Sequence, residues 1–237
     1  MAYDEAKEAA ARASLQFVRD GDVVGLGSGS TATHAVRLLA GRVQAGLKIR
    51  GIPTSNETRD LATSLGVPLV TFDEIQQIDV TIDGADEIDP QLRLIKGGGG
   101  ALLHEKIVAF ASRQFVVVAD SSKQVSALGS FPLPVEVIAF AQALVKREIQ
   151  ALGASVKLRK LSGSAFVTQE GHHILDCSFG QITDPQALAM RLSNIPGIVE
   201  HGLFIDLASV ALVATGDNVI ETRRPLSNKF TSRKDLR

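Results

Sequence analysis

The chain has 237 residues, 45% of them hydrophobic and 22% charged, with a formal net charge of −1. This length and balance are typical of a globular protein with a substantial core and argue against intrinsic disorder. The near-neutral charge creates no global field that favours nucleic acid or an anionic membrane, so an anionic ligand must be held by local donors. No apolar run approaches the roughly 20 residues that a membrane helix needs.

The first residues and the cysteine content indicate where the protein works. Residues 1–20 carry charged side chains among alanines, which is unlike a secretory signal peptide. The single cysteine, Cys177, cannot form an internal disulfide, and this fits a reducing compartment. We therefore expect a cytoplasmic protein that binds neither nucleic acid nor membrane.

Helical patterns and short apolar runs alternate through the first part of the chain. Periodicity predicts helices over residues 4–18, 56–65 and 101–112, with another through 36–39. Strands are expected at the apolar runs, which are residues 23–26, 49–52, 69–71, 80–82, 94–95 and 115–119. Because these runs are continuously apolar instead of alternating, both faces of the sheet should be buried. The pattern predicts an α/β fold with a doubly wound, mostly parallel sheet.

The rhythm changes at Phe131-Pro132-Leu133-Pro134. The expected order after it is strand, helix, strand, strand, helix, strand, at residues 135–138, 141–152, 156–159, 173–177, 184–195 and 198–204. This βαββαβ order predicts a smaller, ferredoxin-like α+β domain inserted at residues 132–206. A hairpin of residues 210–214 and 219–222 would then rejoin the first domain.

The first domain would accordingly be Rossmann-like and comprise residues 1–131 plus 207–237. The polar tail from Arg223 is expected to be loosely ordered.

A glycine- and hydroxyl-rich turn, Gly27-Ser28-Gly29-Ser30-Thr31, follows the first expected strand and opens a helix. Glycines permit a tight turn, and a helix N-terminus offers unpaired N–H groups and a positive dipole to a phosphate. The glycine spacing is G-x-G-x-G, which departs from the dinucleotide fingerprint G-x-G-x-x-G, and no GK[ST] ending follows. We favour phosphate binding over the alternative, a plain serine-capped turn.

Two carboxylates, Asp83 and Asp86, stand at the end of the strand expected at residues 80–82. In open α/β sheets ligands bind beyond the carboxyl ends of the strands, so Asp83-Gly84-Ala85-Asp86 could face sugar hydroxyls. The five histidines are dispersed and give no zinc-type spacing, whereas carboxylate-only binding of Mg²⁺ stays open. An acidic turn without function is about as probable from the spacing alone.

Lys96 precedes four consecutive glycines, Gly97–Gly100, and Glu105 follows in the first turns of the next helix. Ordering four glycines costs conformational entropy, which a chain tolerates where a ligand approaches the backbone or where a loop is flexible. A lysine beside such a loop can stabilise an oxyanion. Glu105 alone would be an ordinary partner of the helix dipole.

Together these features are the parts needed for proton abstraction next to a carbonyl. The motifs GSGST, DGADEID, KGGGGALLHEK, FPLPVEVI and IPGIVEHGLF resemble, in order and spacing, those of the ribose-5-phosphate isomerase A family. The resemblance extends from about Asp4 to Phe204.

The resemblance implies interconversion of D-ribose 5-phosphate and D-ribulose 5-phosphate through an enediol(ate), in the non-oxidative pentose phosphate pathway. It implies no cofactor, no metal, and a homodimer or homotetramer. Glu105 would be the base, Asp83 would assist ring opening or proton transfer, and Lys96 would stabilise the enediolate. The substrate-binding residues implied are Ser28, Gly29, Ser30, Thr31, Asp83, Gly84, Ala85, Asp86, Lys96, Gly97, Gly98, Gly99, Lys123 and, as a further phosphate contact, Lys7.

A carboxylate base serves best with a raised pKa, so we expect Glu105 to be partly shielded from water. Two positions depart from the pattern of bacterial members: Ser28 stands where threonine is usual, and Gly100 where alanine is frequent, so the glycine loop should be more mobile.

Other classes of protein share parts of this pattern. A sugar-phosphate-sensing regulator would need a DNA-binding helix-turn-helix, for which the chain has no room before Gly21 and no basic surface signature. An amino-sugar phosphate deaminase or a lactonase would share the architecture, and a nicotinamide dehydrogenase is disfavoured by the glycine spacing. Cys177 with His172 and His173 could suggest a nucleophile, but a buried or incidental role is more in keeping with its place in the inserted domain.

Overall fold

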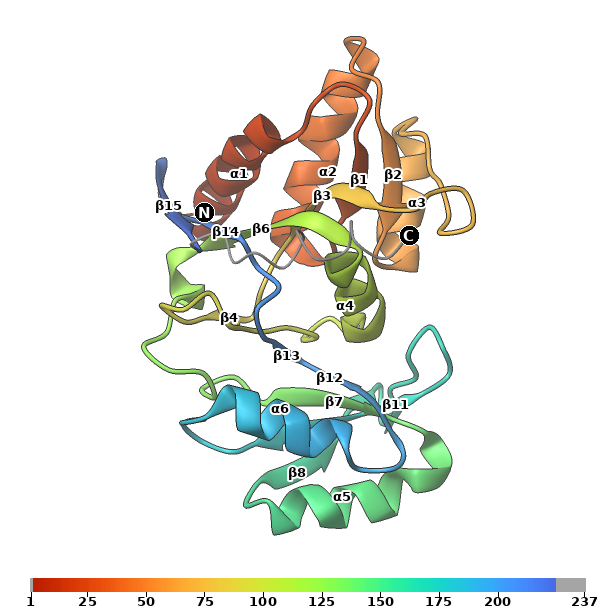
Figure 1. The fold of residues 1–237 in the computed structure, drawn as a ribbon, viewed down its shortest axis with the longest axis vertical. Coiled ribbons are helices and arrows are strands. Elements are labelled where there is room, and N and C mark those ends of the chain that lie inside the picture. Colours follow the sequence, from red (N-terminus) through yellow and green to blue (C-terminus); the bar gives the residue numbers. More distant parts are fainter. Residues whose placement is uncertain (1, 225–237) are drawn as a thin grey trace, which may run out of the picture.

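The computed structural model describes residues 2–224, which form a six-stranded sheet, a four-stranded sheet and a three-stranded sheet between them (Figure 1). The α-helices are α1 (Ala2–Ser14), α2 (Gly29–Gln44), α3 (Asn56–Ser64), α4 (Leu102–Phe110), α5 (Gln142–Ala151) and α6 (Pro185–Ser193). The strands are β1 (Val23–Leu26), β2 (Arg50–Pro53), β3 (Ile78–Asp83), β4 (Glu87–Ile88), β5 (Leu94–Ile95), β6 (Ser112–Asp120), β7 (Leu133–Val137), β8 (Ser155–Leu158), β9 (Lys160–Leu161), β10 (Ser164–Ala165), β11 (His173–Ser178), β12 (Ile198–His201), β13 (Leu203–Phe204), β14 (Val210–Thr215) and β15 (Asn218–Arg223).

The six-stranded sheet has the order β15-β14-β6-β3-β1-β2. All neighbours pair in parallel except the edge hairpin β14–β15, which the sequence correctly placed beside the first domain. Numbered by their order in the chain, the five parallel strands run 2-1-3-4-5, a doubly wound order that reverses between β1 and β3. The predicted α/β class is therefore confirmed, and the reversal point is where such sheets bind ligands.

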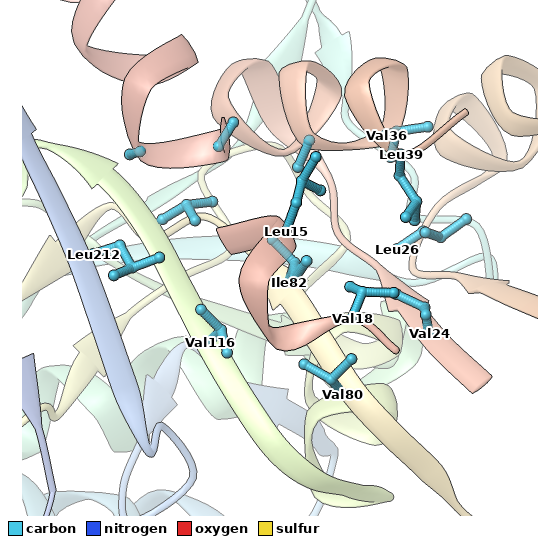
Figure 2. Close-up of a cluster of buried hydrophobic side chains, with 14 of the residues drawn as sticks. Leu15, Val18, Val24, Leu26, Val36, Leu39, Val80, Ile82, Val116 and Leu212 are labelled. Atoms are coloured by element: carbon cyan, nitrogen blue, oxygen red, sulfur yellow. The ribbon is translucent and has the colours of Figure 1, made fainter. Parts of the chain in front are cut away.

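Helices cover both faces of this sheet, which is why its strands are apolar throughout. On one face α1, the short 3-10 turn that follows it and α2 pack on β1, β3, β6 and β14. Figure 2 shows Leu15 of that turn and Leu39 of α2 beside Val80, Val116 and Leu212 of the strands. On the other face lie α4 and the three-stranded sheet, which bury Phe115 and Phe204 completely or nearly so. The buried layers hold the carboxyl ends of β1 and β3 in fixed positions.

Three of the predicted strands differ in the structure. Residues 69–71 form only one parallel bridge, Gly51 to Leu69, because Pro68 lacks an N–H and the Glu74 side chain accepts the N–H of Thr71 (2.8 Å) in a turn. Residues 94–95 pair antiparallel with β4 and β13, outside the main sheet.

The third difference is the strand expected at residues 198–204, which is interrupted at Gly202. Its first part, β12, belongs to the four-stranded sheet, and its second part, β13, belongs to the three-stranded sheet. The chain thus passes from one sheet to the other at this glycine.

The four-stranded sheet has the antiparallel order β12-β7-β11-β8, with α5 and α6 packed on it. In chain order this is 4-1-3-2 with the βαββαβ sequence of elements, so the predicted ferredoxin-like arrangement is confirmed. An additional hairpin, β9–β10, lies between β8 and β11.

The division of the chain at 131/132 and 206/207 remains a proposal. The core of the four-stranded sheet also includes Ile95 and Leu128 from before the first boundary. The predicted loose tail is described only at its start, where Arg223 ends β15 and Arg224 pairs with Asp206 (2.8 Å); the rest lies outside the described residues. Within residues 2–224, no helix combines the length and apolar character that crossing a membrane requires.

Leu39 on α2 is 1% exposed and packs into the main core, so Leu39→Ala should leave a cavity. We expect the free energy of unfolding to fall by about 2–5 kcal/mol, measured by urea titration. The matched change Leu144→Ala, at a side chain 45% exposed on α5, should cost less than about 1 kcal/mol. Equal losses in the two variants would contradict this packing.

Candidate active site

The glycine turn after β1 and the acidic turn after β3 meet at the reversal point of the sheet. The N–H of Gly27 donates to the carbonyl oxygen of Ile82 (2.9 Å), which brings the two turns into contact. A Cβ on Gly27 would lie 2.3 Å from Oδ1 of Asp83, so only glycine permits this approach. The two motifs are separated in the sequence, but the paired parallel strands β1 and β3 bring them into contact.

The N-terminus of α2 is left open toward the site. Ser28 is the N-cap, but its side chain makes no capping hydrogen bond because its Oγ pairs instead with Oγ1 of Thr54 (2.6 Å). Gly29 has φ +82°, in the left-handed region that favours glycine. The first N–H groups of the helix are consequently available to an anion, with the helix dipole favouring negative charge.

Asp83 is fully buried at the end of β3. Its Oδ1 accepts the backbone N–H groups of Ser28 (2.9 Å) and Gly84 (2.7 Å), and its Oδ2 lies 3.0 Å from Nζ of Lys96. No hydrogen bond of good geometry reaches that Oδ2, so its contact with Lys96 is an ion pair. Asp83 thus fixes the glycine turn with one oxygen and the lysine with the other.

Lys96 is 3% exposed and lies between two carboxylates. Its Nζ donates to the carbonyl oxygen of Gly84 (2.6 Å) and lies 3.4 Å from Oε2 of Glu105. Burial alone would lower the pKa of Lys96, but the charges of Asp83 and Glu105 raise the pKa above its usual value. The ammonium is therefore a permanent positive charge in the site.

Glu105 is 5% exposed on the first turns of α4, which confirms the expected shielding from water. Burial raises the pKa of Glu105 to about 7; the charge of Lys96 opposes this rise, and the Asp83 and Asp86 carboxylates add to it. The next residue, Lys106, donates to Oε1 of Glu200 on β12 (2.7 Å), which ties this helix to the four-stranded sheet.

The glycine loop after Lys96 is ordered by contacts on both sides. The N–H of Gly98 donates to Oδ2 of Asp86 (2.7 Å), and the N–H of Gly100 donates to the carbonyl oxygen of Gly97 (3.0 Å). Gly100 has φ +89°, and a Cβ there would lie 2.4 Å from Cζ of Phe166. The ring of Phe166, from the loop between β10 and β11, thus occupies the space that a side chain at Gly100 would need. The sequence did not indicate this packing partner of the glycine loop.

A cavity of about 440 Å³ joins these groups. Every predicted site residue except Asp83 lines it; these are Lys7, Ser28, Gly29, Ser30, Thr31, Gly84, Ala85, Asp86, Lys96, Gly97, Gly98, Gly99, Glu105 and Lys123. Asp83 lies behind Lys96 and Gly84 rather than in the lining. The structure brings the predicted residues together, and it places Asp83 where it acts on its neighbours.

Sequence reasoning missed two groups of lining residues. Ser55, Asn56 and Glu57 come from the N-terminus of α3, where Ser55 accepts the N–H of Thr58 (3.1 Å) as an N-cap. Phe166, Val167 and Gln169 come from the segment between β10 and β11. A serine before a helical stretch could have suggested the first group, whereas nothing in the local sequence indicates that the second segment reaches the site.

The structure also places the residues of the metal and cysteine alternatives. Among residues 2–224 no group of three or more His, Cys, Asp or Glu side chains could hold a metal ion. Cys177 is buried in the core of the four-stranded sheet, and burial raises the pKa of its thiol to about 12, which disfavours the thiolate that a nucleophile needs.

A buried carboxyl group with a pKa near 7, a buried ammonium and an open helix N-terminus share one cavity at the reversal point of an α/β sheet. This arrangement defines an α/β enzyme that acts on a small anionic molecule. Comparison with known proteins identifies the family.

A family model described as ribose 5-phosphate isomerase A (phosphoriboisomerase A) matches residues 50–218. The ribose-5-phosphate isomerase A of Bradyrhizobium diazoefficiens is 54% identical over 95% of this chain and 99% of its own length. A solved D-ribose-5-phosphate isomerase in complex with phospho-erythronic acid superposes with a TM-score of 0.92 at 37% identity, covering 94% of this chain and 100% of the other. Ribose 5-phosphate isomerase A from Methanocaldococcus jannaschii gives 0.87 at 40% identity, over 92% and 97%.

The chain therefore belongs to the ribose-5-phosphate isomerase A family and is an isomerase of the aldose–ketose type. This membership decides against the regulator, the deaminase, the lactonase and the dehydrogenase.

The raised pKa of Glu105 predicts a pH-dependent cost to stability. Because the folded chain holds this proton more tightly than the unfolded chain, stability is lost as the pH rises from 4.5 to about 7, by up to about 1.4 kcal/mol per pH unit. Glu105→Gln mimics the neutral acid and should escape this loss. Urea unfolding should therefore show the variant gaining on wild type across that window, while exposed Glu148→Gln shows no such gain. A constant difference from pH 4.5 to 8 would contradict the raised pKa.

Proposed function

We propose that this chain interconverts D-ribose 5-phosphate and D-ribulose 5-phosphate, with Glu105 as the general base. The observation that carries the proposal is the Glu105 carboxyl group, buried in the cavity, 3.4 Å from the Lys96 ammonium and with its pKa raised to about 7. The relatives named as ribose-5-phosphate isomerases support the choice of substrate.

The phosphate group would bind at the N-terminus of α2. The open N–H groups of this helix lie in the same cavity as the hydroxyls of Ser30 and Thr31 and the side chains of Lys7 and Lys123. Phosphate binding there is remote from the reacting carbons, so its free energy can position them against Glu105.

The reaction would proceed on the open-chain sugar by moving one carbon-bound proton. The Glu105 carboxylate removes the proton from C2 of the aldose, and the electron pair forms the C1–C2 double bond while the aldehyde oxygen becomes negative. The oxygen-bound proton passes from O2 to O1. Glu105 then returns its proton to C1, and the C2–O2 bond becomes the carbonyl of the ketose. A base whose pKa lies near 7 suits both directions of this transfer.

The negative oxygen of the enediolate would be stabilised by Lys96 and by N–H groups of the Gly97–Gly99 loop. One such donor contributes about 10²–10³ in rate, comparable to the base itself at about 10²–10⁴. Asp83 would act through Lys96 in this scheme: its Oδ1 is occupied by two N–H groups, and its Oδ2 faces the ammonium. Asp86, which lines the cavity, would hold sugar hydroxyls.

Assembly as a homodimer or homotetramer and a cytoplasmic location belong to the same proposal. Both follow from the family resemblance.

Replacing the base tests the proposal directly. Glu105→Gln keeps the size and removes the proton acceptor, so kcat for ribose 5-phosphate isomerisation should fall by about 10³-fold or more. Exposed Glu148→Gln should retain wild-type kcat. The wild-type rate should be unchanged by EDTA, since neither base nor oxyanion stabiliser is a metal in this scheme. Retention of activity in Glu105→Gln would remove that residue from the role, and loss of wild-type activity with EDTA would revive carboxylate-bound Mg²⁺.

Replacing Lys123 tests the phosphate end. Lys123→Met removes a charge that would pair with phosphate, so KM should rise about tenfold or more with kcat changed less than about threefold. Lys157→Met, at an exposed lysine of β8 outside the cavity lining, is the matched control and should leave both constants unchanged. An unchanged KM in Lys123→Met would place the phosphate elsewhere.

A further inference from the structure

The side chain of Arg159, which does not line the cavity, holds the glycine loop that follows Lys96. Arg159 follows β8, and its Nη1 donates to the carbonyl oxygens of Gly97 (2.8 Å) and Gly98 (3.1 Å). Neither the motif comparison nor the cavity lining points to this residue.

Arg159 is itself fixed in place. Its side chain is 14% exposed, and its Nε and Nη2 donate to the two carboxylate oxygens of Asp176 on β11, a two-point contact with 3.0 Å at Nε. Its guanidinium lies 5.9 Å from the ring centroid of Phe166, the residue that packs against Gly100. A planar guanidinium held by two points is a rigid donor, and lysine cannot reproduce its geometry.

Because the peptide bond is planar, the hydrogen bond from Arg159 to the Gly98 carbonyl also fixes the direction of the Gly99 N–H. In a trans peptide the carbonyl and the following N–H point to opposite sides of the chain. Arg159 holds the carbonyl of Gly98 and does not line the cavity, whereas Gly98 and Gly99 do. The N–H of Gly99 therefore points away from Arg159, and Gly99 itself lines the cavity. Within residues 2–224 neither the Gly97 nor the Gly99 N–H has a protein acceptor.

Four glycines in succession need such an external constraint. Each glycine adopts positive and negative φ about equally well, so a peptide within the loop can turn over with little steric cost. If the Gly98–Gly99 peptide turned over, its carbonyl oxygen would face the cavity, and a negative dipole would meet the developing oxyanion.

We propose that Arg159 is a positioning residue that orients the Gly98–Gly99 peptide so that the Gly99 N–H, beside Lys96, donates to the enediolate oxygen. The inference rests on the proposed isomerase function and adds a residue from the inserted segment to it. Its effect falls on the transition state, because the hydrogen bonds of the Arg159 side chain within residues 2–224 go to Asp176, Gly97 and Gly98 and none goes to the phosphate end of the cavity.

The test separates the rate of the chemical step from substrate binding. Arg159→Ala and Arg159→Lys are compared with Arg147→Ala, at an exposed arginine of α5. In Arg159→Ala the Gly99 N–H remains but loses its fixed orientation, so kcat should fall by less than the loss of a whole donor, about ten- to a hundredfold, with KM changed less than about threefold. Phospho-erythronate, whose carboxylate presents negative oxygens near the reacting end, should bind more weakly in proportion to the loss of kcat/KM. Inhibition by inorganic phosphate should stay unchanged.

Chemical rescue measures whether added guanidinium restores kcat, which is not expected if Arg159 only stabilises the fold. Millimolar guanidinium should restore the kcat of Arg159→Ala at least fivefold by occupying the vacated site, and should do nothing for Arg147→Ala. If Arg159→Ala does not fold, as judged by circular dichroism, Arg159→Lys decides the matter and should show at least a fivefold lower kcat at unchanged KM.

Three results would overturn the inference: wild-type kcat in Arg159→Lys, a rise in KM together with weaker phosphate inhibition, or a folded Arg159→Ala that guanidinium does not rescue. Failure of the isomerase proposal would be distinct, since it would appear as an inactive wild type or as an active Glu105→Gln.

Discussion

The site depends on one group of buried charges, in which two carboxylates, Asp83 and Glu105, share the single ammonium of Lys96. The described part of the chain does not satisfy all three completely, since Oδ2 of Asp83 and Oε2 of Glu105 are buried without a hydrogen bond from residues 2–224. Within residues 2–224 Asp83 has two backbone N–H partners and Glu105 has none of that kind, so a negative charge on Glu105 is the less well stabilised of the two. Burial, together with the nearby carboxylates, raises the pKa of Glu105 to about 7, which suits the proton exchange that we propose for it.

Such a charge group is costly in the absence of a rigid frame, and the sheet provides that frame. Asp83 is the last residue of β3, whose neighbours β1 and β6 hold it on both sides. The strand order reverses between β1 and β3, so the loops after them diverge and leave room for a ligand. Because Gly27 has no side chain, the glycine- and hydroxyl-rich turn after β1 can pack directly against Asp83. The glycine turn and the Lys96 ammonium thus share one carboxylate.

Much of this could be predicted because it is local. Continuous apolar runs indicated the parallel sheet, and glycines beside Ser28, Asp83 and Lys96 marked the strand ends where ligands bind. What could not be predicted depends on contacts between distant segments. The position of Asp83 behind Lys96, the Phe166 ring against Gly100 and the Arg159 hydrogen bonds each join residues more than ten apart in the chain. Residues 69–71 failed as a strand because Pro68 and a side-chain hydrogen bond from Thr71 override their apolar character.

The interruption at Gly202 shows how the two larger sheets cooperate. Gly202 accepts the N–H of Lys96 (2.9 Å) and donates to Pro134 of β7 (2.7 Å), and a Cβ there would lie 2.3 Å from the carbonyl oxygen of Lys96. The backbone of Lys96 is therefore clamped where the chain crosses between the sheets, while Asp83 of the main sheet holds its ammonium. The loop between β10 and β11 extends toward α3 and α4 in Figure 1 and reaches them through Gln169 and Glu170. The smaller sheet is thus a structural part of the site, since it anchors Lys96, holds the glycine loop and closes one wall of the cavity.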